Sequence, residues 1–250
     1  IASITKLMTA MVTIDKVLPL EESITITAED AQAAQAKRRA RVPVGTTLTR
    51  GELLQLALMA SENVAAVALG RTYPGGTDAF VAAMNAKAAA LDMAGTRFVE
   101  PTGLSSENVS TAGDLAKLVR AAAEYARIAE YSTTPSAEYT IRGRRVPFVN
   151  TNGLVRGNSW EIGVSKTGFI NAAGRCLVME AKVATRTLII VLLDSVGKYT
   201  RIGDANRIRE WLEPGFLAPA EPRERAARTR AAPKPQRAAE ARPRNQATAR

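Results

Sequence analysis

The chain has 250 residues, with 34 Lys/Arg against 24 Asp/Glu and no histidine, so its formal net charge is +10 at pH 7. The lack of histidine excludes a Ser-His-Asp triad, a histidine-ligated zinc site and a histidine proton shuttle. No apolar run reaches the roughly 18 residues that a transmembrane helix needs, and no metal or cofactor is expected. The single cysteine, Cys176, lies in an apolar run and is expected to be a buried thiol without a catalytic role.

The first half of the chain reads as helical. Apolar residues at helical spacing predict a helix over residues 3–18 that is buried on one face and has Ser3 at the positive end of its dipole. Thr49 and Glu52 form a capping-box pattern, which predicts a second helix. This helix would present the triplet 61–63 at its C-terminal end.

Further helices and then strands follow in chain order. The Ala-rich stretch 64–91, interrupted at 74–76, predicts two helices, and another is expected from Thr111 to about Tyr131. Later segments read as strands over 162–166, 176–183 and 188–193, with a hairpin turn at 184–186 and a closing helix over 200–212. The order predicts an α+β fold, with an antiparallel sheet flanked by helices plus a mostly helical lobe.

The composition changes at Leu217. Residues 217–250 are rich in Ala, Pro and Arg and hold nine Lys/Arg against three Asp/Glu, so +6 of the formal +10 lies there. We expect a folded domain over 1–216 and a disordered basic tail over 217–250. The tail would attract anionic wall polymers, a membrane surface or nucleic acid, or act only as a solvated linker.

Three short motifs occur in a fixed order: Ser3-Ile4-Thr5-Lys6, Ser61-Glu62-Asn63 and Lys166-Thr167-Gly168. Their combination is typical of active-serine acyl transfer. Three residues apart on a helix, Ser3 and Lys6 share one face. Without imidazole, the base must be a carboxylate or a lysine whose pKa is lowered from its usual value near ~10.4. Burial would disfavour the cationic form, and a second ammonium such as Lys166, about 4 Å away at a dielectric near 20, would lower the pKa by about three units.

These motifs and their flanking residues resemble the low-molecular-mass penicillin-binding proteins, which are serine D-alanyl-D-alanine peptidases, and most of all the endopeptidase branch. The similarity covers 1–216 and rests on the segments 1–10, 58–63, 100–105, 150–152 and 174–179. It implies a secreted, periplasmic enzyme. The family's signal peptide and N-terminal strands are expected to be missing from this chain.

The resemblance also implies roles for individual residues. Ser3 would attack the carbonyl of the penultimate D-Ala, Lys6 would take its proton, and Ser61 would relay a proton to the leaving amine. Asn63 would hold Lys6 and the substrate backbone. Lys166 would give the site a positive electrostatic potential.

The implied substrate-binding residues are Thr167, Gly168, Phe169 and Arg201. The Thr167 hydroxyl would bind the substrate carboxylate, and Arg201 would steer it. The backbone N–H groups of Ser3 and Phe169 would form the oxyanion hole, in which each donor is typically worth about 2.7 to 4 kcal/mol.

The expected partners are peptidoglycan stem peptides and cross-links, with β-lactams as covalent inhibitors. No E-x-x-L-N segment lies between the second and third motifs, so slow deacylation is expected rather than β-lactamase activity. Three other functions stay open: a carboxypeptidase, a non-catalytic wall-binding or β-lactam-sensing protein of the same fold, and a nucleic-acid binder that uses the tail.

Overall fold

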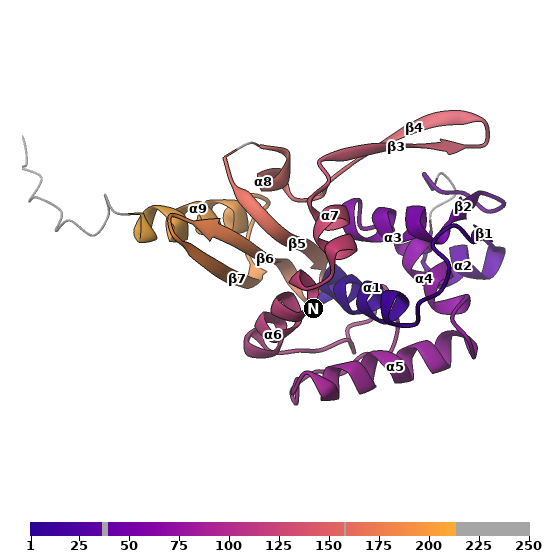
Figure 1. Ribbon diagram of the computed structural model, residues 1–250, viewed down its shortest axis with the longest axis horizontal. Coiled ribbons are helices and arrows are strands. Elements are labelled where there is room, and N and C mark those ends of the chain that lie inside the picture. Colours follow the sequence, from indigo (N-terminus) through magenta and orange to yellow (C-terminus); the bar gives the residue numbers. More distant parts are fainter. Residues whose placement is uncertain (37–39, 158, 214–250) are drawn as a thin grey trace, which may run out of the picture. The chain divides into compact units, whose positions relative to one another are not determined.

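The computed structural model describes residues 1–36, 40–157 and 159–213, which belong to one compact unit. The tail predicted over 217–250 lies outside the described residues. Figure 1 shows the arrangement of helices and strands within the described part. Within it, no helix combines the length and the apolar character needed to cross a bilayer.

The structure contains short helices, longer helices and three small antiparallel sheets. In chain order the elements are η1 (Ala2–Ile4), α1 (Thr5–Asp15), β1 (Ser23–Thr25), α2 (Ala28–Ala33), β2 (Thr47–Thr49), α3 (Arg50–Met59), α4 (Asn63–Arg71), α5 (Gly76–Ala90), α6 (Ala112–Ala123), α7 (Ala126–Thr133), β3 (Ser136–Ile141), β4 (Arg144–Val149), α8 (Gly153–Arg156), β5 (Glu161–Ile170), β6 (Gly174–Val183), β7 (Arg186–Ser195) and α9 (Thr200–Leu212).

The main sheet has the order β5-β6-β7, and both of its faces are covered. Alternate residues of β6 point to opposite faces, as the pleat of a strand requires. Cys176 and Val178 join the core formed with the helical lobe, whereas Leu177 and Met179 join a second core with Ala205 of α9. The predicted α+β fold, with an antiparallel sheet between helices and a helical lobe beside it, is confirmed. Cys176 is buried, as expected.

Helix α1 lies at the centre of the helical lobe, where it contacts α3, α4, α5 and α6. The helix predicted over 3–18 is shorter than expected, since α1 ends at Asp15. It is also more enclosed than expected, because every residue from Thr5 to Thr13 is buried. Val17 adopts a left-handed backbone conformation and is 86% exposed. The helix stops at Asp15 because Pro19 follows closely and restricts the residue before it.

The helix predicted from Thr111 to Tyr131 is two helices, α6 and α7, joined at Glu124 and Tyr125. Tyr125 has an extended backbone, and its hydroxyl donates to Asp15 and accepts from Lys87. The change of direction lets Ser132 of α7 reach β5, where its hydroxyl accepts a hydrogen bond from the Ser165 amide. A straight helix would lose both sets of contacts.

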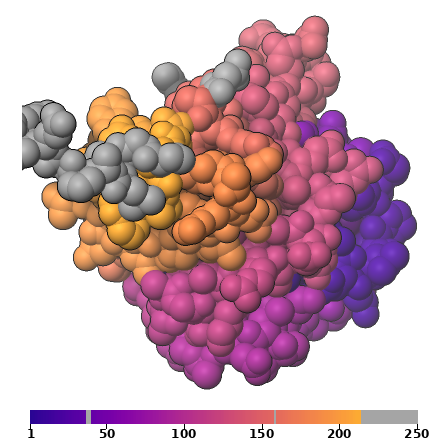
Figure 2. Space-filling model, turned by 60° about the vertical axis from the view of Figure 1, so that its left-hand side comes forward, coloured from indigo at the N-terminus to yellow at the C-terminus, as the bar shows by residue number. Residues whose placement is uncertain are grey.

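The strand predicted over 162–166 continues to Ile170, so Thr167 and Gly168 of the third motif lie inside β5 together with Lys166. The other two strands, the turn at 184–186 and the closing helix are confirmed, as are the two helices within 64–91 and the capping box of α3. The sequence analysis missed α2, α8, the β1–β2 pair and the β3–β4 hairpin. That hairpin projects from the body of the molecule (Figures 1 and 2).

Candidate active site

The first two predicted catalytic residues meet where η1 runs into α1. The Lys6 Nζ atom lies 3.0 Å from the Ser3 Oγ atom. The same Nζ donates to the Asn63 Oδ1 atom at 2.7 Å and to the Thr102 carbonyl at 2.6 Å. The Lys6 side chain is 0% exposed. Partners from three separate segments therefore fix the amine beside the serine hydroxyl.

The Thr102 carbonyl is held in place by a carboxylate in its own loop. Glu100 accepts hydrogen bonds from the amides of Thr102 and Gly103, both at 2.6 Å, and from the Asn108 side chain at 3.0 Å. A carboxylate that accepts several N–H groups makes charge-assisted bonds, which are stronger than neutral ones. Glu100 thus organises the loop that contacts Lys6, although the sequence analysis assigned it no role.

Two glycines let the backbone of the nucleophile pack closely on its neighbours. A Cβ atom on Gly103, whose φ is +83°, would lie 1.8 Å from the Ala2 carbonyl oxygen. A Cβ atom on Gly168 would lie 3.1 Å from the Ser3 nitrogen. Because η1 is enclosed on both sides, Ser3 has little freedom to move.

We expect Gly103→Ala to lower the free energy of unfolding by at least about 3 kcal/mol, since it adds a clash to an unfavourable φ. Acylation by a β-lactam should slow as well, because the displaced segment carries Ser3. Gly45→Ala is a matched control, as Gly45 has the same φ of +83° with nothing within 4 Å. Urea unfolding of both variants checks this result, and equal losses of stability would contradict it.

The second pair of predicted residues lies on the opposite wall. Lys166 of β5 is 1% exposed, and its Nζ donates to the Ser61 Oγ atom at 2.9 Å and to the Thr167 carbonyl at 3.0 Å. Ser61 follows the end of α3 with a left-handed φ of +61°, which is rare for a residue with a side chain. Strained backbone of this kind is concentrated at functional sites.

The two lysines have lowered pKa values. Burial lowers the pKa of Lys6 to about 7, while the Glu100 and Glu62 carboxylates act in the opposite direction. Burial also lowers the pKa of Lys166 well below its ordinary value, and the charges of Lys6 and Arg201 lower it further. The pKa of Lys6 is lowered, as predicted, and burial, one of the two causes expected from the sequence, is the main one. An amine that titrates near neutral pH is able to act as a general base.

The Thr167 hydroxyl donates to the Thr151 hydroxyl at 2.6 Å. Thr151 is exposed and lies between two buried asparagines, Asn150 and Asn152. Asn152 donates to the Ser165 hydroxyl at 2.8 Å and so ties this segment to β5. The segment 150–152 supported the family resemblance, but the hydroxyl pair is visible only in the structure.

Phe169 and Arg201 lie at the outer end of the site. The Arg201 Nη1 atom donates to the Gly168 carbonyl at 3.4 Å. The Phe169 side chain is 51% exposed, and the Arg175 guanidinium lies 4.4 Å from the centre of its ring. All nine predicted residues therefore lie on η1, α1, the 61–63 triplet, β5 or α9, and the hydrogen bonds above connect eight of them into three clusters.

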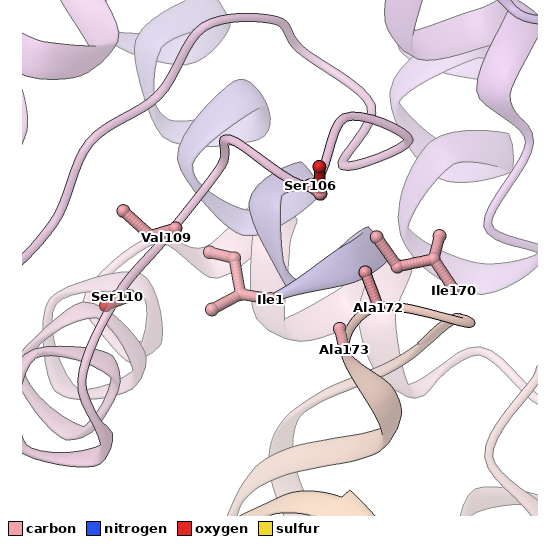
Figure 3. Close-up of a pocket in the computed structure, with 7 residues that line it drawn as sticks. All are labelled: Ile1, Ser106, Val109, Ser110, Ile170, Ala172 and Ala173. Carbon is pink, nitrogen blue, oxygen red and sulfur yellow. The ribbon is translucent and has the colours of Figure 1, made fainter.

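A separate pocket of about 150 Å³ lies beside the first residue and is lined by Ile1, Ser106, Val109, Ser110, Ile170, Ala172 and Ala173. Figure 3 shows Ile1 between the Val109–Ser110 segment and the turn that follows β5. None of the predicted site residues lines this pocket, and none of its side chains is titratable.

The fold and this arrangement of serine and lysine define a serine D-Ala-D-Ala peptidase. The chain belongs to the D-alanyl-D-alanine carboxypeptidase family, whose sequence model matches residues 1–197. It is 49% identical over 217 residues to a D-alanyl-D-alanine endopeptidase of Pseudomonas aeruginosa, which covers 86% of this chain and 70% of that protein. An Escherichia coli D-alanyl-D-alanine endopeptidase is 48% identical over 222 residues, which cover 88% of this chain and 71% of that protein.

Solved structures agree with this assignment. A DD-transpeptidase from Streptomyces superposes with a TM-score of 0.76 at 28% identity, covering 84% of this chain and 86% of that one. A D-alanyl-D-alanine carboxypeptidase from Mycobacterium tuberculosis gives a TM-score of 0.75 at 30% identity, with 88% and 83% covered. The family resemblance inferred from the three motifs is confirmed.

Proposed function

We propose that this chain is an endopeptidase that cleaves D-alanyl cross-links in peptidoglycan, outside the cytoplasm, through an acyl-enzyme on Ser3. The observation that carries the proposal is the 3.0 Å contact between Ser3 Oγ and a Lys6 amine whose pKa is about 7. At neutral pH a large fraction of this amine is uncharged and able to accept the serine proton.

In the first step, Ser3 Oγ attacks the D-Ala carbonyl carbon while its proton passes to Lys6 Nζ. The negative oxygen that develops accepts hydrogen bonds from the backbone N–H groups of Ser3 and Phe169. The C–N bond then breaks as the leaving nitrogen receives the proton held by Lys6, relayed through Ser61, which contacts Lys166. Lys6 is left uncharged. Ser3 is left as an ester of the acyl half of the substrate.

In the second step, water attacks the ester carbon and gives a proton to Lys6, which passes it to Ser3 Oγ as the ester C–O bond breaks and the acid product leaves. Asn63 orients Lys6 through the 2.7 Å bond to its Nζ atom. The Thr167 hydroxyl exchanges its bond to Thr151 for the substrate carboxylate, and Arg201 attracts that carboxylate. β-Lactams acylate Ser3 in the same way. The acyl product persists because the chain has no E-x-x-L-N segment, whose glutamate would activate water, between its second and third motifs.

The endopeptidase assignment is favoured over the carboxypeptidase one by sequence similarity. The two relatives near 49% identity are named endopeptidases, whereas a mycobacterial relative named a carboxypeptidase is 33% identical over 195 residues. Both activities would use the same serine, lysine and oxyanion hole. What distinguishes them is the group attached to the leaving nitrogen.

Mass analysis of the products tests the proposal directly. Digestion of purified cross-linked muropeptide dimers should yield monomers, each of unchanged stem length. Loss of one alanine from pentapeptide stems without cleavage of dimers would instead identify a carboxypeptidase. A protein that forms a penicilloyl adduct but changes neither substrate would support the non-catalytic alternative.

A further inference from the structure

An exposed aromatic ring with a guanidinium on its face lies at the end of β5, and no step of the mechanism uses either side chain. Phe169 of β5 and Arg175 of β6 are directly opposite each other in the strand register. The Arg175 guanidinium lies 4.4 Å from the ring centre, and the ring is 51% exposed. We call these two side chains the Phe169–Arg175 shelf.

The shelf adjoins Thr167 and Arg201, to which the proposed mechanism assigns the carboxylate of the leaving group. Side chains two residues apart on a strand point to the same face, so Phe169 shares a face with Thr167. Between them, the Gly168 carbonyl accepts a hydrogen bond from Arg201. Burial and the nearby Arg175 charge lower the pKa of Arg201, which is consistent with two guanidiniums close together. The shelf therefore extends the corner that Thr167 and Arg201 form for a carboxylate.

The two candidate reactions differ in what reaches beyond that corner. In both substrates the scissile nitrogen is attached to a D-configured carbon that also carries a carboxylate. A single stem ends there in a methyl group. A cross-linked substrate continues instead through a longer side chain, with methylene groups and then the carbonyl and carboxylate oxygens of a second stem peptide.

We propose that the Phe169–Arg175 shelf is the subsite for this longer leaving group and raises the preference for cross-linked peptides over single stems. The methylene groups would lie on the exposed Phe169 ring, and the Arg175 guanidinium would donate to an oxygen of the second stem. A flat guanidinium stacked on a ring still presents its edge N–H groups for such a bond. The proposal rests on the endopeptidase function and adds its specificity determinant.

The test compares kcat/KM for a cross-linked muropeptide dimer with kcat/KM for the matching single-stem pentapeptide. Arg175→Gln should lower the dimer-to-monomer ratio by about tenfold, since one charge-assisted hydrogen bond is lost. Arg175→Lys should recover only part of the ratio, because lysine keeps the charge but not the planar stacking. Arg186→Gln, at the exposed start of β7, is the matched control and should leave the ratio unchanged.

Phe169→Ala gives a second, independent reading, because its backbone N–H remains while the ring is removed. The same ratio should fall again, and melting temperatures identify any variant that fails to fold. Equal losses on both substrates, or a ratio unchanged in both Arg175→Gln and Phe169→Ala, would overturn the shelf as a subsite. Failure of the underlying function would look different, since the wild-type enzyme itself would then release only single alanines.

Discussion

Replacing Ser3 with alanine is expected to reduce peptide hydrolysis by at least about 10³-fold, because no other group in the mechanism forms the acyl-enzyme. The melting temperature should stay close to wild type, since the only side-chain hydrogen bond of Ser3 among the described residues is the one from Lys6. Hydrolysis rates, melting temperature and intact mass after incubation with benzylpenicillin measure the three effects.

The penicilloyl adduct gives the sharpest reading, because it forms at the nucleophile itself. Wild type should gain the mass of one benzylpenicillin, and Ser3→Ala should gain none. Ser23→Ala, on the exposed side of β1, is a matched control that should label like wild type. Retained turnover or a stable adduct in Ser3→Ala would show that the nucleophile lies elsewhere.

The pH dependence of acylation is expected to follow Lys6. The base must be uncharged, so kcat/KM should rise with pH through a limb near the Lys6 pKa of about 7. Lys166→Ala admits water to the buried site, which favours the protonated form of Lys6, because burial is the main cause of its lowered pKa. The limb should therefore move to higher pH by about one unit or more, with a rate loss at pH 6 of about 10-fold or more from this cause.

Removing a negative charge near Lys6 should move the pH limb of acylation in the opposite direction. The Glu62 carboxylate raises the pKa of Lys6, so Glu62→Gln should move the limb to lower pH. Lys182→Ala changes an exposed lysine on β6 and serves as the control, because its charge is solvated and remote in the fold. The limb of the kcat/KM profile could instead lie at the same pH in wild type and in the Lys166 and Glu62 variants. That result would contradict the assignment of Lys6 as the base.

The sequence determined those features that depend on residues close together in the chain. The three-residue spacing of Ser3 and Lys6, the Thr49–Glu52 capping box and the alternation along β6 each follow from one helix turn or one strand pleat. Thr200–Leu212 was predicted with its observed bounds. The three motifs were also enough to indicate acyl transfer and the family, because each motif is local.

Tertiary structure alone decided how the local pieces work together. Thr9 of α1 donates to the Pro101 carbonyl at 2.7 Å, so a polar position that a helical pattern assigns to solvent is buried. Lys166 and Ser61 are 105 residues apart, and Lys6 and Thr102 are 96 apart, yet both pairs are in contact. The hydrophobic periodicity of the sequence does not predict such long-range contacts, because they depend on how separate elements pack.

The sequence predicts from burial and from a neighbouring ammonium that the pKa of Lys6 is lowered, but it does not show which of the two causes dominates. Spacing identifies which charges are available, but the desolvation of an amine depends on everything that surrounds it. Here the surroundings come from η1, the Glu100 loop and the start of α4, which meet only in the folded protein. The pairing of Lys6 with Ser3 was encoded locally, whereas the acidity of this amine is a property of the packed interior.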